Sequence, residues 1–186
     1  MLSWFRSRAE DRRRAIDFYG AIVARARTPA FFARHGVLDT PEGRTALIIL
    51  LMFPVLERLQ AGGKRERRFA RFLSEAFVTD IDDCLREMGV GDISVPKKVK
   101  RAAQALGQRC VAYGRAAEAA SPAAALAEEL ATTVPGLEAN PAGADALARL
   151  TLEFKAGLAA RSPASLMSGG LDFPDPASAA ALAAQT

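Results

Sequence analysis

The sequence predicts an all-α protein, and three observations support that prediction. Apolar residues recur every three or four positions through most of the chain, which is the spacing of one helix face. No segment alternates apolar and polar residues as a half-buried strand would. Ser, Thr or Asn repeatedly stands directly before proline where a helical pattern begins, as expected for an N-cap followed by a first-turn residue.

The N-terminal part of the chain is predicted to form one long helix and one short turn. Apolar residues at helical spacing extend over about residues 9–27, with arginines on the other face. Thr28-Pro29 interrupts this pattern, because proline cannot supply the backbone N–H that a continuing helix needs. A single turn over 30–34 is then expected to end at Gly36.

The most apolar stretch predicts the most buried helix. Thr40-Pro41 marks its start, and the helix is expected to reach about Gln60, before Gly62-Gly63. Residues 46–56 are all apolar, but this run is too short to cross a membrane, which takes about 20 residues. Pro54 lies inside the run and is expected to kink the helix.

The next two helices are predicted to form a hairpin around the sequence LREMGVGDISVPKKVKR, residues 85–101. A phosphate-binding loop would need a lysine or a further glycine where Asp92-Ile93-Ser94 follows, so that interpretation is excluded. Gly89 is expected to end the first helix, and Ser94 or Asp92 to cap the second. One continuous apolar stripe is predicted along the first helix, from Phe69 to Met88.

Two alanine-rich helices are predicted to complete the domain, over about 122–133 and 141–160. The chain is therefore expected to form a single domain of six to seven packed helices over residues 8–161. Residues 162–186 are rich in Pro, Gly, Ser and Ala, and they are expected to form a loosely ordered tail.

Charge is distributed unevenly along the chain. The net charge is +4, but residues 1–114 carry +8 and residues 115–186 carry −4. A basic front part favours an anionic partner such as RNA or a phospholipid surface, although ordinary solvation of an arginine-rich chain explains it equally well. No secretory signal is recognisable. Leu2, Trp4 and Phe5 would allow contact with a membrane surface, unless the terminus is simply frayed.

The sequence offers little support for catalytic or metal chemistry. His35 is the single histidine, and Cys84 and Cys110 fall on apolar stripes, which favours buried free thiols. Asp80, Asp83 and Glu87 share a helix face at a spacing that all-α isoprenoid synthases use to hold Mg²⁺, but the second acidic cluster that those enzymes need is absent. We therefore expect a solvated acidic face, no metal, no cofactor and no enzymatic activity.

Three blocks of sequence together resemble one known family. They are YGAIVARARTPAFF at 19–32, GVLDTPEGR at 36–44 and DIDDCLREMGVGDISVPKKVKR at 80–101. Their order is similar to that in the ubiquinol–cytochrome c chaperone family, the assembly factors of the cytochrome b-containing respiratory complex. The resemblance covers about residues 12–115, and the alanine-rich region after Ser121 does not contribute to it.

The resemblance implies an all-α, non-enzymatic chaperone that receives newly made apo cytochrome b and promotes biogenesis of ubiquinol–cytochrome c reductase. Mitochondrial members of the family act with a small helper protein near the ribosomal exit, so the ribosome and a helper protein are implied partners. Because the chain has no obvious presequence, it is expected to be a bacterial member. It would then work at the cytoplasmic, inner face of the cytoplasmic membrane.

The resemblance also carries Asp39 and Arg44 over as candidate partner-binding positions. A cation in the first turn of a helix is disfavoured by the helix dipole, so Arg44 is expected to pair with a partner or with an internal acid such as Asp80 or Asp83. The other acidic candidates for partner binding are Asp80, Asp83 and Glu87. The basic candidates for a surface facing anionic lipid or ribosomal RNA are Lys64, Arg65, Arg67, Arg68, Arg71, Lys97, Lys98, Lys100 and Arg101.

Two other functions stay open at the level of sequence. The basic front part favours an RNA- or ribosome-binding helical protein. The acidic face at Asp80, Asp83 and Glu87 would suit a magnesium-dependent enzyme of the isoprenoid type, which requires a deep pocket lined by these acids.

Overall fold

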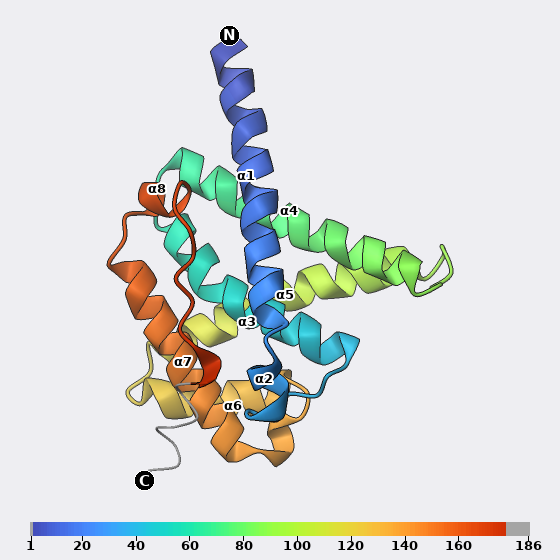
Figure 1. The fold of residues 1–186 in the computed structure, drawn as a ribbon, viewed down its shortest axis with the longest axis vertical. Coiled ribbons are helices and arrows are strands. Elements are labelled where there is room, and N and C mark those ends of the chain that lie inside the picture. Colours follow the sequence, from blue (N-terminus) through green and yellow to red (C-terminus); the bar gives the residue numbers. More distant parts are fainter. Residues whose placement is uncertain (1, 178–186) are drawn as a thin grey trace.

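The computed structural model describes residues 2–177, with side chains from residue 6 onward. No strand occurs in this range, so the predicted all-α class is confirmed. The long helices pack around α3, and the start of α1 and the hairpin of α4 and α5 project from the body (Figure 1). Residues 178–186, the end of the predicted tail, lie outside the described part of the chain.

Helix α3 (Pro41–Gln60) is the central element, as predicted. Thr40 caps it, since its side-chain oxygen accepts a hydrogen bond from the backbone N–H of Gly43 at 3.1 Å. Every residue from Ala46 to Leu56 is buried, including Pro54. Helices α1, α4, α5 and α7 all pack against α3, which explains why it is apolar on every side. The kink at Pro54 stays a prediction.

Helix α1 (Leu2–Ala26) starts earlier than the predicted residue 9, because neither glycine nor proline occurs in its first four turns. Its buried face packs along α4 (Lys64–Glu87), where the rings of Phe18 and Phe69 meet edge to face with centroids 5.8 Å apart. The short α2 (Pro29–Ala33) follows, and Gly36 ends this turn with a positive φ of 74°, as predicted.

A buried carboxylate joins α1 to the first turns of α4. Asp11 is 1% exposed; it accepts hydrogen bonds from Arg65 at 2.8 and 3.1 Å and from Arg68 at 3.1 Å. Burial raises the pKa of Asp11, but the hydrogen bonds and charges of the two guanidinium groups outweigh burial and hold that pKa below its usual range. Two cations that were predicted to face a partner, Arg65 and Arg68, are therefore engaged with a carboxylate of the same chain.

Helices α4 and α5 (Val95–Ala117) form the predicted hairpin. Gly89 ends α4 with a positive φ of 73°, as predicted. Neither residue proposed as a cap for α5 acts as one: Ser94 makes no side-chain capping hydrogen bond, and Asp92 pairs with Arg86 at 2.9 Å. The predicted apolar stripe is buried only as far as Phe77, because the end of α4 extends past the body (Figure 1).

The C-terminal half is built from α6 (Pro122–Thr133), the 3₁₀ turn η1 (Leu137–Ala139) and α7 (Pro141–Ala159). The bounds of α6 and α7 agree closely with the two predicted alanine-rich helices. Asn140 caps α7 by accepting a hydrogen bond from the backbone N–H of Gly143 at 3.0 Å, whereas Ser121 makes no such bond to α6.

Residues 162–177, the described part of the predicted tail, lie against the helices. After the short α8 (Pro163–Leu166), the chain returns along α7, and the ring of Phe173 packs on that of Phe154 with centroids 5.0 Å apart. Arg25 of α1 donates to the backbone carbonyls of Phe173 and the residue after it. The domain boundary at residue 161 stays a prediction.

Replacement of Asp11 tests the link between α1 and α4. Asp11→Asn removes the negative charge that balances the partly buried Arg68, so we expect a loss of about 2 kcal/mol in the free energy of unfolding at about pH 7. Because the folded-state pKa is depressed, this stabilisation is present above the unfolded-state pKa of Asp11 and is lost as the pH falls through the folded-state pKa. Urea unfolding below about pH 4 should therefore show a smaller difference.

The matched control is Asp17→Asn, an exposed aspartate on the same helix. It should unfold like the wild type at both pH values. Equal losses in the two variants would contradict the role given to Asp11.

Candidate binding surfaces

The GVLDTPEGR block forms the junction at which α3 and α7 both begin. The backbone carbonyl of Leu38 approaches Gly43 so closely that an added Cβ would stand 2.0 Å from its oxygen. Helix α7 repeats the arrangement, since a Cβ on Gly143 would stand 2.1 Å from the carbonyl oxygen of His35. Both helices start with the same pattern of cap, proline, any residue and glycine, TPEG and NPAG. These glycines let one loop pass between two helix starts.

His35 has a structural place in this junction. Its side chain is buried, and its Nε2 atom lies 2.7 Å from the backbone carbonyl oxygen of Pro176. Its own carbonyl accepts a hydrogen bond from the Asn140 side chain at 3.0 Å. The single histidine therefore links the loop before α3 to the N-terminus of α7 and to the end of the described chain.

Asp39 and Arg44 pair with each other. Arg44 Nε lies 2.6 Å from Asp39 Oδ1, and this hydrogen bond lowers the pKa of Asp39. The expectation that Arg44 pairs with Asp80 or Asp83 is wrong, because Asp39 precedes the N-cap and so lies over the helix turn that carries Arg44. Both side chains are about half exposed and border an open hollow of about 570 Å³ beside Phe32, so they stay candidates for contact with a partner.

The acidic candidates do not form a metal site. Asp80 accepts a hydrogen bond from the Tyr19 hydroxyl at 2.7 Å, while Asp83 and Glu87 are exposed. Burial and then the Asp80 carboxylate raise the pKa of Tyr19, so the phenol stays protonated and donates. Between residues 2 and 177, no group of three or more Asp, Glu, His or Cys side chains could hold a metal ion. The isoprenoid-type interpretation finds no support in the described residues.

The basic candidates divide into engaged and unpaired side chains. Arg65 and Arg68 hold Asp11, and Arg67 donates to the carbonyl of Gly62 at 2.8 Å. The others are exposed and form no ion pair with the residues that the structure describes: Lys64, Arg71, Lys97, Lys98, Lys100 and Arg101. Most of this unpaired positive charge therefore lies on the first turns of α5.

The tip of the α4–α5 hairpin exposes apolar side chains beside those cations. Ile93 is 97% exposed and Met88 is 55% exposed. The α4 arm carries exposed Asp83 and Glu87, so the tip is not uniformly basic. Projecting apolar residues next to charged ones are typical of a contact surface for another macromolecule.

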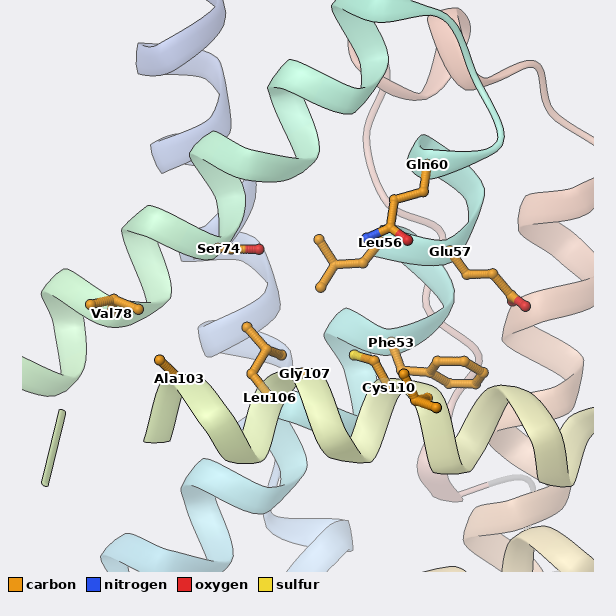
Figure 2. Close-up of a pocket in the computed structure, with 11 residues that line it drawn as sticks. Phe53, Leu56, Glu57, Gln60, Ser74, Val78, Ala103, Leu106, Gly107 and Cys110 are labelled. Carbon is orange, nitrogen blue, oxygen red and sulfur yellow. The ribbon is translucent and has the colours of Figure 1, made fainter. Parts of the chain in front are cut away.

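A groove of about 450 Å³ lies between α3, α4 and α5, where the two arms of the hairpin diverge (Figure 2). Its larger apolar side chains come from all three helices: Phe53 and Leu56 of α3, Val78 of α4, and Leu106 and Val111 of α5. Sequence reasoning missed this groove. The available signal was a pair of small residues one turn apart, Ala103 and Gly107.

The two cysteines are free, as predicted. They are half-buried, whereas the prediction was that they are buried. Cys110 lines the groove, and burial, together with the charge of Glu57, raises the pKa of its thiol to about 12. Burial also raises the pKa of Cys84, and Asp80 adds to that effect. Both thiols therefore stay protonated near neutral pH and are poor nucleophiles.

The model of the ubiquinol-cytochrome C chaperone family matches residues 33–173, well over half of the chain. This chain belongs to the ubiquinol-cytochrome c chaperone family. The family match extends beyond residue 115, so the alanine-rich region that the sequence resemblance left unexplained is part of the family unit.

A solved structure of a family relative agrees with this assignment. The crystal structure of the Cbp3 homolog from Brucella abortus matches with a TM-score of 0.82 and 31% sequence identity, covering 95% of this chain and 97% of that chain. A search of curated proteins returned no match. In the described part of this family member, no helix is long and apolar enough to cross a membrane.

Replacement of Gly43 tests the junction shared by α3 and α7. In Gly43→Ala the new methyl group collides with the Leu38 carbonyl, so we expect a loss of about 3 kcal/mol in the free energy of unfolding, measured by urea titration.

Gly107→Ala is the matched control, since a Cβ at this position of α5 has no neighbour within 4 Å. Alanine is the better helix former, so this variant should gain about 0.5–1 kcal/mol. A Gly43→Ala protein as stable as the wild type would show that the loop is free to move away.

Proposed function

We propose that this protein is a non-enzymatic assembly chaperone that binds newly made cytochrome b and promotes biogenesis of ubiquinol–cytochrome c reductase. The observation that carries the proposal is membership of the ubiquinol-cytochrome c chaperone family over residues 33–173. The likeness to a Cbp3 homolog over nearly the whole chain supports it. The apolar groove and the apolar hairpin tip also support it, because a chaperone for a membrane protein needs surfaces to which apolar segments can bind.

We infer a peripheral position at the cytoplasmic face of the inner membrane of a bacterium. The start of α1 projects from the body (Figure 1), and its sequence places Leu2, Trp4 and Phe5 just before a run of arginines. Arg12 and Arg13 are exposed. Aromatic residues beside cations are typical of segments that lie on anionic lipid. The ribosome and a small helper protein are further proposed partners.

Affinity capture from membranes in mild detergent tests the proposed client. Cytochrome b is expected to be recovered with the tagged chain, because a chaperone holds its client until handover. A strain lacking the chain should contain less cytochrome b and less assembled reductase, measured by haem spectra and native gels. Subunits of an unrelated respiratory oxidase serve as the control and should change in neither experiment. Normal cytochrome b and reductase levels in the deletion strain would count against the proposal.

The unpaired cations of α5 give a test of the proposed anionic partners. A variant with Lys97, Lys98, Lys100 and Arg101 all replaced by Ala should lose most of its salt-sensitive sedimentation with ribosomes or with anionic vesicles, since each cation near such a surface contributes about 1 kcal/mol. Arg149→Ala is the control, because that exposed arginine is already paired with Asp145 at 2.8 Å. Binding equal to wild type at low salt would remove this surface from the proposal.

The RNA-binding alternative is separated by the same two measurements. Ribosome binding that depends on the α5 cations, combined with no recovery of cytochrome b, would favour a ribosome-binding protein over a chaperone.

A further inference from the structure

The walls of the groove between α3, α4 and α5 have a spacing and length that suit the binding of a short helix. On α5, Ala103, Gly107 and Val111 recur every fourth residue, so successive turns of one helix face form one wall. Ser74 and Val78 do the same on α4. The α5 wall extends for about 12 Å at the 1.5 Å rise of a helix, which matches about two turns of an incoming helix.

The chemistry of the groove favours an apolar occupant. Two of its polar side chains are engaged within the protein: Glu57 pairs with Lys155 at 2.7 Å, and the Ser74 hydroxyl donates to the Ala70 carbonyl at 3.1 Å. Gln60 also lines the groove and is exposed. Val111 is 56% exposed, although it is apolar. Small residues on both walls would let the backbone of another helix approach closely, as in packing between membrane-spanning helices.

Two cations without an ion pair in the described residues lie about one helix turn before residues that line the groove. Arg71 shares the α4 face of Ser74 and Val78 at helical spacing, and Lys100 precedes Ala103 by three residues on α5. Because α4 and α5 are joined as a hairpin, Arg71 near the start of α4 is far from the hairpin tip, whereas Lys100 near the start of α5 is close to it. Both are exposed and form no ion pair in the described part of the chain. This arrangement complements an apolar helix that carries an acidic residue at an end.

We propose that this groove holds an apolar helix of the membrane-spanning type from the client, with an acidic residue of that helix beside Arg71 or Lys100. The inference rests on the proposed chaperone function and deepens it by naming the docking site and the class of segment that docks. A helix held there would have its apolar face shielded from water by the apolar lining, in which Val78 and Val111 are the more exposed side chains, until it is released.

Site-specific photo-crosslinking in cells identifies the occupant. A photoreactive phenylalanine analogue in place of Val111 is expected to form an adduct with cytochrome b, and mass spectrometry should map it to an apolar membrane-spanning segment. The same analogue in place of Glu153, exposed on α7, is the control and should give no such adduct. Adducts from position 111 with a second copy of the chain, with lipid or with a polar loop of cytochrome b would overturn the inference.

Filling the groove gives an independent test with a matched control. Gly107→Phe places a ring in the groove, whereas Gly157→Phe places one on the exposed face of α7; an added Cβ at either position has no neighbour within 4 Å. Circular dichroism should show both variants folded. We expect about a tenfold loss of cytochrome b captured by Gly107→Phe and no loss for Gly157→Phe.

The two proposals fail in different ways. Full capture of cytochrome b by Gly107→Phe would remove the groove as the docking site and leave the chaperone function intact. Failure of the wild-type chain to capture cytochrome b would remove the function itself. Arg71→Glu combined with Lys100→Glu should lower capture several-fold by charge reversal; unchanged capture would contradict the acidic residue that we assign to the occupant.

Discussion

Burial of α3 on every side is the constraint on which the rest of the structure depends. A helix with no polar face between Ala46 and Leu56 is stable in water only when other helices surround it. Helices α1, α4, α5 and α7 are held in place by this requirement, although they come from both halves of the chain. Their own polar contacts, such as Asp11 with Arg65 and Arg68, then fix how the surrounding helices lie against one another.

The surfaces available for binding follow from where α3 ends. Helices α4 and α5 are longer than the part of α3 that they cover, so their hairpin continues into solvent and exposes Met88 and Ile93 (Figure 1). Nearer the body the two arms diverge, and side chains of α3 close the gap between them only partly, which leaves the groove (Figure 2). Apolar surface is therefore exposed at two places on one hairpin.

Much of the fold could be predicted because its signals are local. The cap at Thr40, the apolar run of α3 and the turn glycines at Gly36 and Gly89 each depend on a few neighbouring residues, and all were found in the sequence. The Asp11 cluster and the groove join segments that are far apart in the chain, so helical periodicity could not reveal them. Arg44 shows another limit: a dipole argument predicted a binding partner or a distant acid, but the side chain pairs with the neighbouring Asp39.

The junction around His35 has a consequence for synthesis of the chain. The His35 and Leu38 backbone groups bond to Asn140 and Pro135, more than 90 residues later. Closing so long a segment is entropically costly and slow compared with forming a helix. On a translating ribosome, α1 to α5 would therefore emerge before the contacts of His35 and Leu38 with Asn140 and Pro135 can form. The protein can complete its tertiary structure only after the alanine-rich helices have been made.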